Sequence, residues 1–65
     1  PIAAAAAAAH HVLQHAEPVL LEPANAYVRR RQHQIAERYN LSSESRGREP
    51  NRQVNIFSSR TGRSQ

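Results

Sequence analysis

The sequence predicts an α+β domain in which a small three-stranded sheet carries two helices packed on one face. Two observations concern the helices: an alanine-rich segment opens the chain, and a later segment carries apolar residues at helical spacing. A third observation concerns the strands: one short apolar segment lies between two prolines, and two later segments, the second of them alternating, flank a loop with glycine and proline. Packing both helices on one side of the sheet buries one face of every element. The predicted order is helix-strand-helix-strand-strand.

The first helix is predicted over residues 3–16, because alanine has the highest helix propensity. Pro18 ends it, since a proline pushes the preceding residue out of helical angles. The short apolar segment 19–22 lies between Pro18 and Pro23 and predicts a buried strand. Apolar residues recur along one side of this helix at Ala5, Ala9, Val12, Leu13 and Ala16.

A second helix is predicted to begin near Pro23–Asn25, with Asn25 as its cap, and to stop at Asn40. Helical spacing divides this helix into two sides. The apolar side carries Val28, Ile35, Ala36 and Tyr39. The opposite, solvent-facing side carries Ala26, Arg29, Arg30, His33 and Glu37.

Two strands are predicted at residues 41–45 and 52–57. In the second strand, Val54 and Ile56 alternate with polar residues, which is the period of a half-buried strand. The same alternation predicts that Phe57 lies on the opposite face from Val54 and Ile56.

The segment between these strands predicts a hairpin-like loop, because it contains Gly47 and Pro50. After Phe57 the chain has no apolar pattern. We therefore expect one domain over residues 3–57, followed by a flexible basic tail over residues 58–65.

Length and charge narrow the class of function. A chain of 65 residues makes one small domain with a thin core and no deep substrate pocket. The formal charge is +4, and all nine lysine-plus-arginine positions are arginine. Arginine presents a rigid fork of donors that suits phosphate oxygens, so we expect a polyanion as partner, nucleic acid first.

The absence of cysteine excludes disulfides and thiolate metal sites, and it fits a cytoplasmic, intracellular protein. The apolar runs are much shorter than the roughly 18 residues of a membrane-spanning helix, so no membrane partner is expected.

One motif has the spacing of a phosphate site. Arg29 and His33 are four residues apart on the second predicted helix, which places their Cβ atoms ~5–6 Å apart. We expect both side chains to project together into solvent and to bind one phosphate or two neighbouring backbone oxygens. Arg52 is expected to approach from the sheet, and Arg46 and Arg48 from a mobile loop.

This motif and the segment after it resemble a known family. Arg29-x-x-x-His33 on a helix, followed by "SESRGREPNR" and an alternating strand, resembles the R-3-H domain. The segment "LEPANAYVRRRQH" is similar to the bacterial Jag-type (SpoIIIJ-associated) RNA-binding proteins, and also to R-3-H segments joined to ATPases. The resemblance covers roughly residues 10–57. Its motif positions correspond to Asn25, Arg29, Arg30, His33, Gly47, Pro50 and Arg52.

The resemblance implies an α+β domain that binds single-stranded DNA or RNA without catalysis. The chain departs from the Jag-type pattern at two positions that are usually apolar, which are Arg31 and Gln32 here. This departure weakens the packing expected at that turn, unless the arginine stem lies along the core with its charged group in water.

Several of these residues also have a structural interpretation. The run 29–31 is equally typical of a solvated helix face. His33 also suits a hydrogen bond to a loop carbonyl that holds the helix to the sheet. Arg52 suits an ion pair with Glu44 or Glu49 as well as a phosphate contact.

The sequence contains no complete metal or catalytic motif. His11 and His15 are four residues apart, but a zinc-protease helix requires glutamate where Val12 stands, and no nearby carboxylate completes a site. No histidine–carboxylate pair is placed to activate the serines of segment 41–45. We therefore predict no enzymatic activity, metal, cofactor or small-molecule substrate.

Two functions remain. The first is a module of a larger protein that binds single-stranded RNA or DNA through backbone phosphates. The second is a docking module that contacts another protein, or other domains of its parent protein, through the alanine-rich helix and Phe57. Phe57 suits both, because its ring stacks on a base or packs against protein. The candidate nucleic-acid-binding residues are Asn25, Arg29, Arg30, His33, Arg48 and Arg52.

Overall fold

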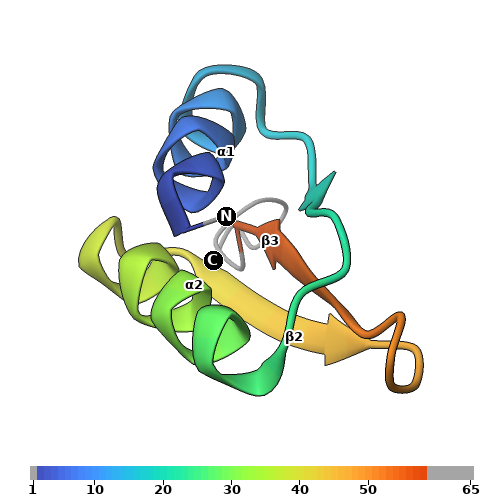
Figure 1. Ribbon diagram of the computed structural model, residues 1–65. Coiled ribbons are helices and arrows are strands. Elements are labelled where there is room, and N and C mark those ends of the chain that lie inside the picture. The colour runs from blue at the N-terminus through green and yellow to red at the C-terminus, as the bar shows by residue number, and fades with distance from the viewer. Residues whose placement is uncertain (1, 59–65) are drawn as a thin grey trace.

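The computed structural model describes residues 2–58, which form two helices and three strands (Figure 1). The elements are α1 (Ile2–His15), β1 (Val19–Leu20), α2 (Ala26–Arg38), β2 (Ser42–Arg46) and β3 (Gln53–Phe57). The predicted α+β class and the predicted order are both confirmed. Of the predicted tail, Ser58 follows β3 outside any strand, and the remaining residues, 59–65, lie outside the described part of the chain.

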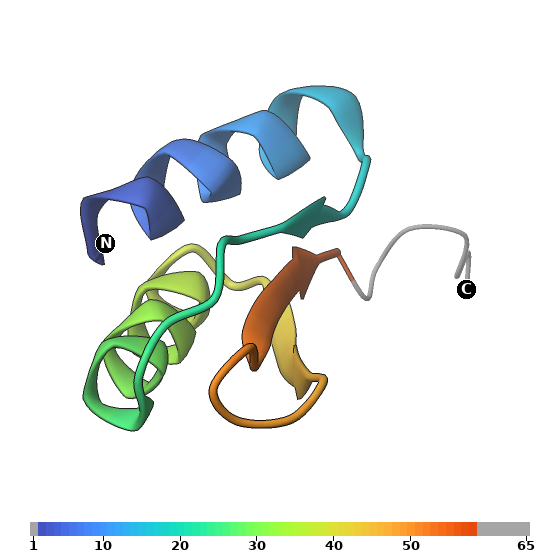
Figure 2. The ribbon, with the colours of Figure 1, turned by 45° about the vertical axis from the view of Figure 1, so that its right-hand side comes forward.

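The three strands form one antiparallel sheet with β3 in the centre and β1 and β2 at its edges. Both helices lie on the same side of this sheet (Figure 2). Val54 and Ile56 of β3 are 0% exposed and point toward the helices. Phe57 therefore lies on the outer face, as predicted, because successive side chains of a strand alternate.

The core is small and takes most of its residues from α1 and β3. On α1 the predicted apolar side is partly wrong, since Leu13 is 56% exposed, Ala16 is exposed, and Ala8 is buried. Ala16 has φ 57, a left-handed conformation that ends the helix at His15. The buried core comprises Ala5, Ala8, Ala9, Val12, Leu21, Ala36, Leu41, Val54 and Ile56.

Both ends of α2 are where the sequence predicts them. At its start, Asn25 Oδ1 accepts a hydrogen bond of 2.9 Å from Val28 N–H, which is an N-cap. At its end, Asn40 adopts φ 59 and donates its N–H to Glu37 O. Leu41 N–H reaches Ala36 O at 2.9 Å, so the two bonds together form a Schellman motif.

The strands are shifted slightly from their predicted positions. β1 is only Val19–Leu20, although Leu21 N–H still bonds to Val54 O at 2.8 Å. β2 includes Arg46, so this arginine lies on the sheet and not on the loop as predicted. The loop then turns at Gly47, whose φ of 86° and distance of 3.3 Å from an added Cβ to Asn51 O leave little room for a side chain.

Candidate nucleic-acid interface

Arg29 points inward. It is 9% exposed, and its Nη1 donates to Ala24 O at 2.6 Å. Its Nη2 donates to the Glu49 carboxylate at 2.7 Å. The prediction that this guanidinium projects into solvent is therefore wrong. The planar guanidinium has two acceptors inside the chain, on separate segments.

These bonds make Arg29 a link between three segments. The side chain starts on α2, bonds to the β1–α2 connection at Ala24, and reaches the β2–β3 loop at Glu49. The last two segments also bond directly, because Ala24 N–H donates to Arg52 O at 3.2 Å. Arg29 therefore fixes where the loop and its arginines lie relative to α2.

The buried stripe of α2 contains more polar residues than predicted. Gln32 is 1% exposed, whereas Arg31 is exposed. The buried positions of this helix are Arg29, Gln32 and Ala36, which are spaced by three and four residues. The departure from the Jag-type pattern thus has two outcomes, since the glutamine is accommodated in the interior and the arginine stands in solvent.

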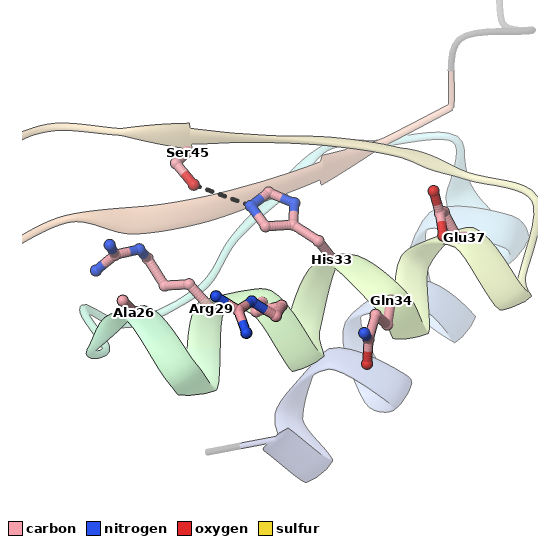
Figure 3. Close-up of a pocket in the computed structure, with 7 residues that line it drawn as sticks. Ala26, Arg29, His33, Gln34, Glu37 and Ser45 are labelled. Carbon is pink, nitrogen blue, oxygen red and sulfur yellow. Dashed lines mark hydrogen bonds between the residues drawn. The ribbon is translucent and has the colours of Figure 1, made fainter.

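His33 links α2 to β2. Its Nδ1 lies 2.6 Å from Ser43 Oγ, and its Nε2 lies 2.9 Å from Ser45 Oγ. Figure 3 shows the ring between the helix and the strand, with its bond to Ser45 drawn. The structural interpretation of this histidine is therefore correct in kind, although its partners are two hydroxyls of the sheet and not a loop carbonyl.

The surroundings of His33 keep it neutral. Burial lowers its pKa below the ordinary value of 6.5, and the positive charges of Arg29 and Arg52 lower the pKa further, while Glu37 opposes them. A neutral imidazole donates from one nitrogen and accepts at the other. One of the two serine hydroxyls must therefore donate its proton to the ring.

An open pocket of about 380 Å³ lies beside this histidine. It includes Arg30, whose side chain is exposed, and it borders the first turn of α2, where the helix dipole favours an anion. Glu37 also lines it, so the pocket holds one negative charge (Figure 3). The lining residues are Ala26, Arg29, Arg30, His33, Gln34, Glu37 and Ser45.

The arginines differ in their engagement within the chain. Within residues 2–58, the ion pairs of arginine join Arg29 to Glu49 and Arg46 to Glu44. Arg52 donates from Nη1 to Gly47 O at 2.7 Å, so the predicted choice of Glu44 or Glu49 as its ion-pair partner is wrong. Its charge still acts on the imidazole of His33.

The structure brings only part of the predicted set together. Arg29, Arg30 and His33 line one pocket, with Arg52 close enough to influence the histidine. Arg48 is exposed on the β2–β3 loop and does not line the pocket. Asn25 does not line it either, and its side-chain oxygen caps the helix.

A family model of the R-3-H domain matches residues 2–58. The chain belongs to the R-3-H domain family. Members of this family generally bind nucleic acid. Neither the search of curated proteins nor the search of solved structures gave a match.

The motif of this R-3-H domain has partners that the sequence did not reveal. Ser43 and Ser45 hold His33, and Glu49 holds Arg29. The serines were detectable in principle, because they alternate in β2 and face the same side as Val54 and Ile56 once the register is known. No sequence pattern predicted that Glu49 binds Arg29, because the position of Glu49 depends on the conformation of the β2–β3 loop.

The histidines of α1 lie outside the motif. Glu17 Oε1 lies 3.3 Å from His11 Nε2. The His11 and His15 rings are tilted by 39° to each other, with centroids 4.5 Å apart. In the described part of the chain, no group of three or more histidine or acidic side chains is arranged to hold a metal ion. Neither helix within residues 2–58 has the length and apolar character that a membrane span requires.

Proposed function

We propose that this R-3-H domain binds single-stranded RNA or DNA through backbone phosphates, as a module of a larger protein of the Jag type. The observation that carries the proposal is the pocket beside α2. There the exposed Arg30, the charge of Arg52 and the first turn of the helix converge next to His33. Donors of this kind suit a phosphate and provide little contact with base edges.

The candidate residues divide into two roles. Arg30 contacts a phosphate because it lines the pocket, and Arg48 and Arg52 do so from the loop that Arg29 holds against α2. None of the three is in an ion pair within residues 2–58. Arg29 and Asn25 position the site, the first by holding the loop and the second by capping α2. His33 holds α2 to the sheet through its bonds to Ser43 and Ser45, and it takes up a proton when a phosphate binds. No step of this function is catalytic.

Contacts with the phosphates of the nucleic acid determine the expected affinity, sequence preference and salt dependence. The pocket contains no tyrosine or phenylalanine, so affinity there depends little on base identity. Charge–charge contacts with phosphates also weaken as salt rises. We therefore expect modest affinity, weak sequence preference and a clear salt dependence.

Fluorescence anisotropy with a dye-labelled, unstructured oligonucleotide tests the proposal at low salt. The informative variant combines Arg30→Gln with Arg48→Gln, because both side chains are exposed and neither forms an ion pair within residues 2–58. Its matched control combines Arg31→Gln with Arg38→Gln, which removes the same charge from α2 outside the pocket. We expect at least a tenfold weaker Kd for the first pair, if each phosphate contact contributes about 1 kcal/mol, and a smaller loss for the control. Absence of binding at low salt, or equal losses for both pairs, would contradict the proposal.

The docking alternative keeps only part of its first surface, which is α1. The apolar side of α1 packs inside the domain through Ala5, Ala9 and Val12, which leaves Leu13 as its exposed large apolar side chain. Phe57 remains on the outer face of the sheet. The side chains around Phe57 determine whether that face suits a protein or a nucleotide.

A further inference from the structure

A second pocket, of about 410 Å³, lies on the outer face of the sheet. Asn55 and Phe57 of β3 reach it because they alternate with the buried Val54 and Ile56. It is therefore separated by the sheet from the pocket beside His33. Its lining residues are Ala16, Pro18, Glu44, Arg46, Asn55, Phe57 and Ser58.

The side chains of this pocket match the parts of a nucleotide. Phe57 is half-buried and presents an aromatic ring, on which any base can stack. Asn55 carries an amide, which has both donors and an acceptor for a base edge. Arg46 supplies a cation for a phosphate.

Arg46 is available for such a contact. Its Nε lies 3.4 Å from Glu44 Oε1, and the two side chains are 62% and 53% exposed. An ion pair this open to water is weak. A phosphate can therefore take the place of Glu44 on Arg46 at little cost.

The edge of β2 connects this pocket to the proposed phosphate site. β2 is an edge strand, and Ser45 lines the pocket beside His33, whereas the next residue, Arg46, lines the outer pocket. A single strand that crosses this edge therefore meets both pockets within a short length. A duplex is too wide and stiff to make the same turn.

We propose that the outer pocket binds one base of the same single strand, stacked on Phe57, with Arg46 on an adjoining phosphate. This inference rests on the proposed function, because it needs the strand to be bound beside α2. It goes further by adding a contact with a base to a site that otherwise binds the backbone. A protein segment is the competing occupant, and the polar lining by Asn55, Glu44 and Arg46 favours the nucleotide.

Two dye-labelled oligonucleotides of about eight residues, within the site sizes of small single-strand-binding domains, test the inference. One carries thymine bases, and the other is abasic throughout, so that both present the same phosphates. The full chain should bind the thymine strand at least about fivefold more tightly, which is the lower end of the effect of one stacked base. Phe57→Leu should remove this difference and leave the affinity for the abasic strand unchanged.

Two further variants separate stacking from folding. Phe57→Tyr keeps the ring and should retain the preference for the thymine strand. Leu13→Ala removes an exposed apolar side chain of α1 outside this pocket and should change neither affinity. Circular dichroism and thermal unfolding establish that each variant is folded.

The possible results have distinct meanings. If neither strand binds at low salt, the proposed function fails, and this inference fails with it. If both strands bind equally, or Phe57→Leu keeps the preference, the base site is wrong while the phosphate site stands. That result would leave the outer pocket to a protein partner.

Discussion

The guanidinium of Arg29 lies 2.7 Å from the Glu49 carboxylate, so the arginine of the Arg-x-x-x-His motif is already paired inside the domain. The histidine of the motif is also engaged, because both of its ring nitrogens lie within hydrogen-bond distance of serine hydroxyls. In this chain the motif therefore has a structural role, because it links α2 to β2 and to the β2–β3 loop, while other arginines on α2 and the loop remain accessible. Arg30 and Arg52 are better placed than Arg29 to meet a phosphate.

Removing Arg29 should destabilise the fold. Arg29→Ala deletes two hydrogen bonds of a nearly buried charged group, and we expect the free energy of unfolding to fall by about 2–3 kcal/mol. Urea unfolding measures this loss. Arg30→Ala is the control and should stay within about 0.5 kcal/mol of the parent, because its side chain is exposed. Equal stability of the two variants would mean that Arg29 does not hold the loop.

Neutralising Glu49 should strengthen the binding of nucleic acid. Glu49→Gln leaves the charge of Arg29 uncompensated near the pocket, and we expect oligonucleotide affinity to rise by about two- to fivefold at low salt and to converge with the parent at high salt. The loss of stability should be below about 1 kcal/mol, because the Glu49 side chain is 61% exposed. Glu17→Gln, at the end of α1, changes the net charge equally and serves as the control. An equal gain in that control would assign the effect to net charge alone.

The stability of the free domain should depend on His33 in acid. The pKa of His33 is lowered in the fold below 6.5, so the unfolded chain takes up a proton first as the pH falls. Stability should therefore be full above about pH 7 and decrease as the pH falls below 6.5, until the folded domain is protonated as well. Thermal unfolding across this range measures the effect. His33→Gln should flatten the profile, whereas His15→Gln, at an exposed position, should leave it unchanged.

Binding should respond to pH in the opposite direction. The negative charge of a bound phosphate raises the pKa of His33, as Glu37 does, and opposes the lowering by Arg29 and Arg52. Binding of a phosphate is therefore accompanied by uptake of a proton. We expect tighter binding near about pH 6 than near about pH 8. When the ring is protonated, both nitrogens donate to the serines, so the ring holds neither hydroxyl proton, and that of Ser45, which lines the pocket, can bond to a phosphate.

Two serine variants test whether Ser45 couples the protonation of His33 to phosphate binding. Ser45→Ala should weaken the pH dependence of oligonucleotide affinity, because Ser45 lines the pocket. Ser43→Ala removes the other partner of His33 outside the pocket and should retain most of the pH dependence. If affinity is independent of pH in the parent and survives His33→Ala, then this histidine has no direct role.

The fold was predictable because its signals are local. The alanine segment, the cap at Asn25, the stop at Asn40 and the alternation of Val54 and Ile56 each depend on neighbouring residues, and the structure has all of them. The burial of α2 was harder to predict. Helical periodicity ranks side chains by polarity, so it placed Arg29 in solvent and gave no reason to bury Gln32.

The site was only partly predictable for a related reason. The orientation of Arg29 depends on acceptors at Ala24 and Glu49, which are 5 and 20 residues away in sequence. The serines that hold His33 depend on the register between β2 and β3. Contacts of this kind are set by tertiary packing, which the spacing within one helix does not encode.

The salt dependence of oligonucleotide binding tests the central claim most directly. If about four phosphates are neutralised, a plot of log K against log salt for a single strand should have a slope of roughly −3. Arg30→Gln should make that slope less steep by about 0.7, which is the share of one contact. A slope near zero, or one that Arg30→Gln leaves unchanged, would contradict phosphate binding at the pocket beside α2.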